Sequence, residues 1–379
     1  MVDGVSHDWL IEVRDSAGAM VATVDEFESF ACTIKHLAPG PWSLALPLDT
    51  EPARLLLKNG YGVEVRRYGL PIMSGLVIAA EVDTGDGRGL VTVSGLDDLV
   101  ILADRLASPQ PGTAAPPYAT TAYDTRSGIA ETIIKQYANV NAGPGAVSTR
   151  RWPGFTIATD LARGSSVAGT GRWQSAFDLC RELAVAGGLG LRCVSLIFDV
   201  YVPVDRTTSV EFSHRRDSLG ALKFSHQAPQ ATFVYCGGGG EGTARTIVEA
   251  INSPAIASGW WRRERFRDAR DTTDATILAQ RALEDLGVDL DTIAVGVDAE
   301  VFEVPGCKWG TDYEVGDLVS IVTPWDVTLT RRVEQVTVVM TPDAGTVITP
   351  TLGTLCPEAD PLIAALAGQN RRLARLETR

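Results

Sequence analysis

The stretch WLIEVRDSAGAMVATV at residues 9–24 holds two short runs of alternating apolar and polar residues around the turn Asp15-Ser-Ala-Gly18. Alternation with a period of two is typical of a strand with one buried face, and two such runs around a turn indicate a β-hairpin. Similar runs follow at Ala31–Ile34, Trp42–Leu46, Tyr61–Tyr68, Pro71–Val82 and Gly89–Ser94. Short strands at this spacing predict a barrel-like β domain over residues 1–105.

The composition and the periodicity of the sequence change in the middle of the chain. Residues 106–124 are rich in Pro, Ala and Thr without any periodicity, which predicts a linker. Two helical patterns follow, at about Thr125–Ala138 and about Trp173–Ala186, and a pattern of paired strands continues to Val202. We therefore expect a mixed α+β domain over 125–215.

The strand pattern returns at about residue 216 and is interrupted by one helical pattern at Asp274–Leu286. This predicts a second barrel-like β domain with an inserted helix over 216–355, followed by a helix over 356–379. The expected fold class is mainly β with α+β: two barrel-like β domains flank a mixed α+β domain, and a helix ends the chain.

The net charge, the length of the apolar runs and the N-terminal residues each argue against one class of protein. The 379 residues carry 34 Lys and Arg against 47 Asp and Glu, a formal net charge of −13. Coating nucleic acid requires a basic surface, so the acidic balance argues against that task. No apolar run reaches the roughly 18–20 residues of a membrane span. The N-terminus lacks the basic and apolar parts of a signal peptide, which predicts synthesis in a cytoplasm without export by that route.

The sequence contains few patterns that are typical of catalytic or metal-binding sites. The six cysteines form no C-x-x-C pair, so isolated buried thiols are expected instead of a zinc site or a disulfide framework. The four histidines form no H-E-x-x-H pattern, and no G-x-S-x-G elbow is present. We predict no catalytic residue, no metal ligand and no cofactor. Paired carboxylates acting on a glycan stay open as an alternative.

The glycine run at 237–242 satisfies the pattern G-x-G-x-x-G and follows a predicted strand. A dinucleotide site would need the run to open a helix and a second strand to end in an acid about 20 residues later. The residues that follow favour another strand and no such acid. The run therefore predicts a glycine turn between strands.

One basic and aromatic cluster, WWRRERFRDAR at 260–270, is present. Aromatic and Arg side chains together bind single-stranded nucleic acid in some proteins. The acidic chain favours the other reading, a strand at a subunit or domain boundary whose Arg side chains pair with nearby acids. The candidate contact residues are Trp260, Trp261, Arg262, Arg263, Arg265 and Arg267.

The last helical pattern has apolar or amide residues at alternating spacings of four and three, typical of a coiled-coil seam. A seam of about two heptads is too short to be stable alone. It either joins subunits that are already held together or packs on its own domain. The candidate trimer-contact residues are Leu362, Leu366, Gln369, Leu373 and Leu376.

Several phrases occur in an order that resembles the minor tail proteins of siphophages, the tail-hub or baseplate-hub-like family. The phrases include PGPWSLALP at 39–47, YGLPIMSG at 68–75, WQSAFDLCREL at 173–183 and YEVGDLV at 313–319. The glycine run at 237–240 is richer in glycine than the family pattern. Only the short helix follows the hub-like part, so no peptidoglycan-cutting role is expected.

The resemblance implies a homotrimer whose paired barrels form a pseudo-sixfold ring between a sixfold tail tube and a threefold tip. It implies a place at the tail tip of the virion, with the distal tail protein ring and other tip proteins as partners and the tape-measure protein in the lumen. The expected function is a structural hub that gates DNA passage without binding DNA specifically, with acids lining the lumen. The alternatives are a cell-wall-degrading tail enzyme and a host-surface binding module.

Overall fold

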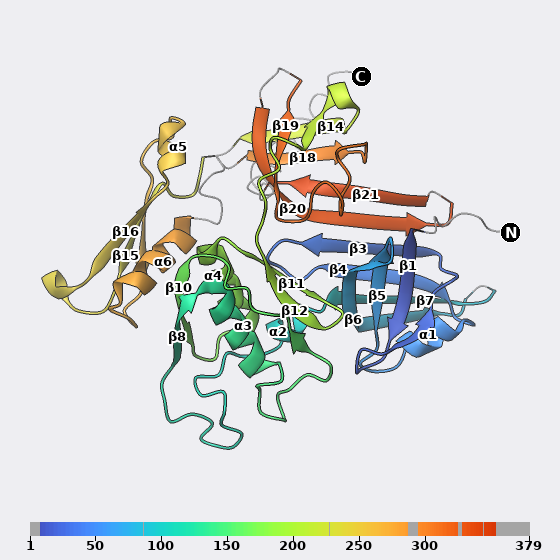
Figure 1. Ribbon diagram of the computed structural model, residues 1–379, viewed down its shortest axis with the longest axis horizontal. Helices are drawn as coiled ribbons and strands as arrows, with labels where there is room; N and C mark the ends of the chain where they lie inside the picture. The colour runs from blue at the N-terminus through green and yellow to red at the C-terminus, as the bar shows by residue number, and fades with distance from the viewer. Residues whose placement is uncertain are drawn as a thin grey trace, which may run out of the picture.

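The computed structural model describes residues 8–85, 87–226, 228–286, 295–324, 328–343 and 345–353 (Figure 1). Its fold is mainly β with α+β, as predicted. The N-terminal part contains two short helices, α1 (Glu51–Leu56) and α2 (Val100–Ala103). Its strands are β1 (Trp9–Arg14), β2 (Met20–Thr23), β3 (Ser29–Lys35), β4 (Pro41–Pro47), β5 (Gly62–Arg67), β6 (Leu70–Asp83) and β7 (Leu90–Asp97). The predicted hairpin at 9–24 is confirmed as β1 and β2, paired antiparallel.

The N-terminal strands join the C-terminal strands in one sheet of 13 described strands. The C-terminal members are β13 (Glu211–Ser213), β14 (Leu219–His226), β18 (Val295–Val301), β19 (Leu318–Val322), β20 (Thr328–Thr341) and β21 (Gly345–Leu352). The main order is β14-β18-β21-β20-β3-β4-β7-β6-β5-β1-β2, and β13 and β19 lie off this path. The join is the antiparallel pair β20–β3, in which Val338 lies opposite Cys32. One hydrophobic cluster runs across this join, because Phe30, Leu44, Phe212 and Val336 all belong to it.

The mixed region packs its helices on short strands around a second hydrophobic cluster. Its elements are β8 (Asp124–Ile129), α3 (Ala130–Asn141), β9 (Thr156–Ile157), β10 (Ser166–Gly171), α4 (Ala176–Gly187), β11 (Gly190–Val194) and β12 (Ile197–Tyr201). Helix α4 begins where the Ser175 hydroxyl accepts a hydrogen bond from the Asp178 amide, and it ends at Gly188, whose φ of 69° suits glycine.

The prediction of a helix from Thr125 was wrong at its start. Residues 124–129 form β8, which pairs antiparallel with β10, and α3 begins only at Ala130. The strand satisfies its backbone groups through β10, and its residues alternate between half-buried and exposed. The apolar face of the helix, which includes Ile133, Ile134 and Tyr137, begins after this strand.

Residues 228–286 form a small unit with its own hydrophobic cluster. The unit holds β15 (Phe233–Gly237), β16 (Ile247–Ile251), α5 (Ser253–Ala257), β17 (Glu264–Asp268) and α6 (Ala275–Leu286). Helix α6 confirms the predicted inserted helix, and the Asp274 carboxylate accepts the Thr276 amide at its start. In Figure 1 this unit lies at one end of the molecule, with α6 between its sheet and the α+β region.

The domain boundaries predicted at residues 105, 124, 215 and 355 stay predictions. The barrel-like shape of the two predicted β domains also stays a prediction. The predicted helix at 356–379, with the candidate seam from Leu362 to Leu376, lies outside the described residues.

Candidate functional site

The predicted contact residues lie next to and within β17, at the edge of a small sheet with one exposed face. In the sheet β16-β15-β17, Val234 and Cys236 are buried in the cluster shared with α6, so Phe233 and Tyr235 face the opposite way. Neighbouring strands add apolar side chains to this opposite face. We call this the outer face; its residues are Phe233 and Tyr235 of β15, Ile247, Glu249 and Ile251 of β16, and Glu264, Phe266 and Asp268 of β17.

The outer face exposes large apolar side chains between its acids. Phe266 is 53% exposed, Ile247 50% and Ile251 39%. The Arg262 guanidinium lies 3.7 Å from the centre of the Phe233 ring and pairs with Glu264 at 2.5 Å. Contiguous exposed apolar residues of this kind mark interaction surfaces.

The other arginines of the cluster are engaged inside the same unit. Arg267 lies 3.0 Å from Glu284 and 3.1 Å from Asp285, both on α6. Arg265 lies 3.8 Å from Asp285, and Arg263 donates to the carbonyl oxygen of Pro229 at 2.8 Å. The structure therefore divides these arginines, with Arg262 over the outer face and with Arg265 and Arg267 paired to α6 on the opposite side. Their role as a contact between subunits or domains stays a prediction.

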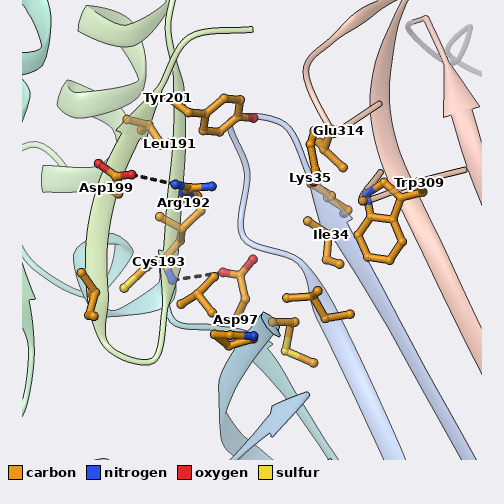
Figure 2. Close-up of a pocket in the computed structure, with 18 of the residues that line it drawn as sticks. Ile34, Lys35, Asp97, Leu191, Arg192, Cys193, Asp199, Tyr201, Trp309 and Glu314 are labelled. Carbon is orange, nitrogen blue, oxygen red and sulfur yellow. Dashed lines mark hydrogen bonds and ion pairs between the residues drawn. The ribbon is translucent and has the colours of Figure 1, made fainter. Parts of the chain in front are cut away.

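A cavity of about 510 Å³ lies at the junction of the large sheet and the α+β region (Figure 2). We call it the junction cavity. Its walls come from β3, from the start of β6, from the β11–β12 hairpin and from the loops at 202–206 and 309–317. No pattern in the sequence indicated this cavity, because each wall is an ordinary strand or loop and only the fold brings the walls together.

His36 and Tyr201 close one side of this junction. The His36 Nδ1 atom lies 2.8 Å from the Tyr201 hydroxyl oxygen. Burial and the nearby Arg332 lower the pKa of His36 to about 3, against an ordinary value of 6.5. His36 is therefore neutral at pH 7 in the folded protein.

Acidification is expected to destabilise the protein through His36. Below pH 6.5 the His36 side chain becomes protonated in the unfolded chain, whereas in the folded protein it stays neutral down to about pH 3. The free energy of unfolding therefore falls as the pH is lowered between these values. From pH 6.5 to pH 5 the loss is about 2 kcal/mol for one such group. Chemical denaturation of the wild type and of His36→Phe at both pH values tests this, because the difference between the two slopes isolates His36. Parallel pH profiles would contradict the assignment.

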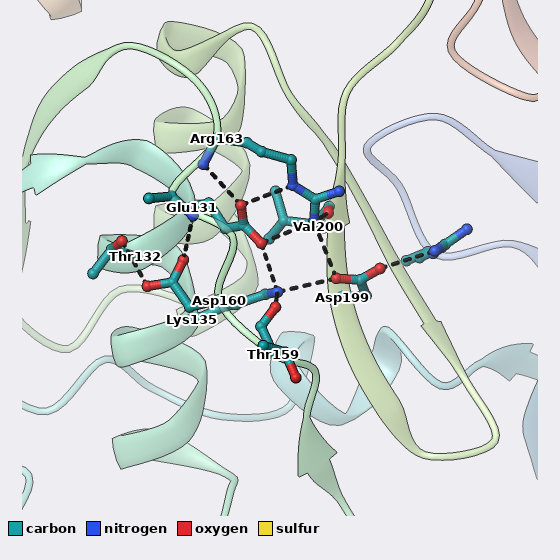
Figure 3. A network of polar contacts seen from close by, with 10 residues as sticks. Glu131, Thr132, Lys135, Thr159, Asp160, Arg163, Asp199 and Val200 are labelled. Carbon is teal, nitrogen blue, oxygen red and sulfur yellow. Dashed lines mark hydrogen bonds and ion pairs between the residues drawn. The ribbon is translucent and has the colours of Figure 1, made fainter.

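A buried polar network joins α3 to β12 (Figure 3). The Glu131 side chain is fully buried and accepts hydrogen bonds from Lys135 Nζ at 2.7 Å and Arg163 Nε at 2.8 Å. Lys135 also reaches Asp199 at 3.0 Å and the carbonyl oxygen of Thr159 at 2.7 Å. Burial alone would raise the pKa of Glu131, but the bonds from Arg163 and Lys135 hold it well below its ordinary range. These groups satisfy one another, so the network is a structural tie.

Sequence reasoning missed this network, although one signal was available. Glu131 and Lys135 are four residues apart on a helical pattern, a spacing that favours an ion pair. Nothing local marks Arg163 or Asp199 as their partners.

The remaining predicted features are simple to place. Cys32, Cys180, Cys193, Cys236 and Cys307 are free and buried, as predicted, and Cys356 lies outside the described residues. The glycine run connects β15 to β16, which are antiparallel, so the predicted turn between strands is confirmed. A Cβ at Gly238 would lie 2.7 Å from a methyl group of Leu278, so α6 packs closely there.

In the described ranges no group of three or more His, Cys, Asp or Glu side chains is placed to hold a metal ion. The helices described are all too short or too polar to cross a bilayer.

Three solved structures share this fold along nearly the whole chain. The 43 kDa tail protein of prophage MuSo2 from Shewanella oneidensis matches with a TM-score of 0.61 at 13% identity, covering 92% of this chain and 98% of the other. The tail protein from Neisseria meningitidis MC58 matches with a TM-score of 0.59 at 12% identity, covering 91% and 96%. Prophage tail protein gp18 from Listeria monocytogenes EGD-e matches with a TM-score of 0.58 at 11% identity, covering 97% and 99%. A search of curated proteins found no match.

The fold is therefore that of phage tail proteins. The family model of the Siphovirus ReqiPepy6 Gp37-like proteins matches residues 10–354, and the chain belongs to this family. The predicted resemblance to tail-associated proteins of siphophages is confirmed.

Proposed function

We propose that the chain is a structural component of the phage tail tip, a homotrimeric hub that joins a sixfold tail tube to a threefold tip and gates DNA passage. The observation that carries the proposal is the single sheet that unites both strand-rich regions of the chain through β20–β3, in a fold shared with tail proteins. A rigid body of this kind suits a ring that must keep its shape under load. Its partners would be the distal tail protein ring, other tip proteins and the tape-measure protein.

The outer face supplies a subunit contact in this proposal. A cyclic trimer needs two different surfaces on each subunit, one meeting the other of its neighbour. The outer face offers exposed aromatic and aliphatic side chains with Arg262 among them. Aromatic and Arg side chains are the types that contribute most to protein interfaces.

The mass of the purified protein in solution tests the trimer. Light scattering at several concentrations is expected to give three times the chain mass of 40.4 kDa. A monomer at all concentrations, or six copies in a map of the tail tip, would refute the proposal.

The variant Phe266→Ser is expected to raise the dissociation constant of the trimer by about 30-fold, the effect of losing an interface hot spot. Leu161→Ser is the matched control, because Leu161 is 61% exposed and lies outside the outer face. Sedimentation equilibrium measures both. Equal dissociation constants for the two variants would place the subunit contact elsewhere.

The net charge suggests how DNA passes. A conduit that repels phosphate would carry a large share of the net charge of −13 per subunit on its inner surface. The arginines at 262–267 would lie at contacts between subunits or domains. A map of the assembled tip tests this directly, since a lumen lined by arginine would contradict it.

A further inference from the structure

Two arginines from distant parts of the chain are tied together where the end of α2 meets the loop after α3. Arg105 follows α2, and Arg150 lies in the loop. The Arg105 Nε atom donates a hydrogen bond to the carbonyl oxygen of Arg150 at 3.2 Å. The Arg150 side chain donates in return to the carbonyl oxygen of Leu106. We call Arg105 and Arg150 the arginine pair. Bonds to the main chain hold both guanidinium groups in place.

No carboxylate balances the arginine pair. Among the residues that the structure describes, neither arginine forms an ion pair, nor does Arg151, the next residue in the loop. Asp104, the acid beside Arg105 in the sequence, is exposed and forms none either. Acids outnumber basic residues in the chain by 47 to 34, so the composition gives no reason to expect a basic cluster without acids.

The charges of the arginine pair act on each other. Both side chains are half-buried. Burial and the charge of Arg105 lower the pKa of Arg150, and no acid opposes this effect. Arginine does not lose its proton in proteins, so the repulsion persists at neutral pH. An anion bound to both groups would remove this repulsion.

The unused nitrogens of the arginine pair can be reached from solvent. Arg105 has two guanidinium nitrogens without a hydrogen bond and Arg150 has two, and none of them is enclosed by the protein. They differ in this from the Nε atoms of Arg67 and Arg206 at the junction cavity, which are enclosed. The Trp152 ring lies beside Arg105, its centre 5.7 Å from the guanidinium carbon.

The charge of the site indicates which anion it suits. A phosphomonoester carries about −1.5 to −2 charges at pH 7 and three acceptor oxygens. A carboxylate carries one charge and two oxygens, so it would leave the arginine pair partly unbalanced. The planar guanidinium group donates two parallel hydrogen bonds to phosphate oxygens, and such charge-assisted bonds are stronger than neutral ones.

We propose that Arg105 and Arg150 bind a phosphate group, with Arg151 adding positive charge beside them. The phosphate oxygens accept hydrogen bonds from the unused guanidinium nitrogens. Inorganic phosphate, a phosphomonoester and the backbone of a nucleic acid all carry this group. The site does not depend on the proposed function, because no step of its argument uses the trimer or the tail tip.

Calorimetric titration of the full chain with inorganic phosphate in a Tris-chloride buffer tests the proposal. We expect saturable binding that is at least about tenfold tighter than the binding of acetate, because acetate brings less charge to the same donors. The fluorine NMR signal of Trp152, in protein labelled with fluorotryptophan and assigned with Trp152→Phe, should move saturably because Trp152 lies beside Arg105. No saturable binding of phosphate, or equal affinity for acetate, would overturn the proposal.

Arg150→Gln removes the charge and keeps a donor for the carbonyl oxygen of Leu106. It is expected to weaken phosphate binding about tenfold. Arg54→Gln is the matched control, because Arg54 is exposed on α1 and also donates to a main-chain carbonyl oxygen, that of Asp49 at 3.2 Å. Equal affinity for phosphate in the two variants would refute the site. If Arg150→Gln does not fold, the comparison of phosphate with acetate on the wild type decides alone.

A further titration identifies the source of the phosphate. A single DNA strand of about ten nucleotides without a terminal phosphate presents phosphodiesters alone. Binding of this strand that Arg150→Gln weakens would support the site and assign it to a nucleic acid. Binding of inorganic phosphate without binding of the strand would support the site and assign it to free phosphate or a phosphomonoester.

Discussion

Asp98→Ala is expected to lower the free energy of unfolding by about 3–5 kcal/mol, because it leaves a buried guanidinium without its counter-ion. Arg14 and Asp98 form an ion pair whose side chains are 1% and 0% exposed. Asp98 also accepts hydrogen bonds from the Ser74 hydroxyl at 2.5 Å and from the Leu196 amide at 3.3 Å. Urea denaturation of the variant and the wild type measures the loss.

Asp98 also stabilises a strained turn. Ser195 and Leu196, which join β11 to β12, have φ values of 53° and 61°, a region that residues other than glycine rarely adopt. Ser195 donates its amide to Ser74 and its hydroxyl to Glu64, both at 2.7 Å. The Asp98 carboxylate, which accepts the Leu196 amide, therefore joins the large sheet to the tip of the β11–β12 hairpin. Asp98→Ala should loosen this junction as well.

Two further variants separate the ion pair from general damage. Arg88→Ala removes an exposed arginine that pairs with Glu26 and Asp49, and should leave the unfolding midpoint nearly unchanged. The double variant Arg14→Met with Asp98→Leu should recover much of the loss, because no charge is left buried. A double variant less stable than Asp98→Ala would show that the two residues do not act as a pair.

Glu131→Ala is expected to cost a similar amount, about 3–5 kcal/mol. The substitution removes the acceptor of Lys135, which is itself buried, and of three donors of Arg163. Helix α3 then loses its side-chain bonds to Arg163, and only Lys135 of this network still binds Thr159 and Asp199. Hydrogen exchange of the α3 amides should accelerate, and urea denaturation gives the size of the effect.

The same residue carries an acid dependence of known sign. The folded pKa of Glu131 lies well below its ordinary value of 4.5, since the bonds from Arg163 and Lys135 outweigh burial. Its contribution is therefore complete above about pH 4.5 and is lost as pH falls towards the folded pKa. Glu131→Ala should show a flatter decline of stability below pH 4.5. Asp178→Ala, which breaks an exposed pair with Arg181, serves as the control, and an equally flat decline there would refute the attribution.

Local patterns predicted the elements that local forces determine. The hairpin of β1 and β2 follows from alternation around Asp15–Gly18, and α6 follows from Asp274 and the apolar spacing after it. The prediction failed at β8 because Ile129 fits the helical spacing of Ile133 and Tyr137. The pairing with β10, about 40 residues later, decides the outcome there and leaves no local trace.

The join of the two strand-rich regions could not be predicted from such patterns. Thr33 and Thr337 share a hydrogen bond across β3 and β20 at a separation of 304 residues. The junction cavity has the same origin, because Lys35, Arg192 and Trp309 come from distant segments. By contrast, the cluster at 260–267 was found from sequence, since its aromatic and basic residues are consecutive.

The β20–β3 pair also sets the order of events during translation. The partner of β3 does not exist until the ribosome has added those 304 residues, which takes roughly 15–60 s at typical bacterial rates. During this time the nascent chain presents the open edge of a strand, the kind of surface on which β proteins aggregate. We therefore expect the yield of folded protein to depend on chaperone capacity and on translation speed.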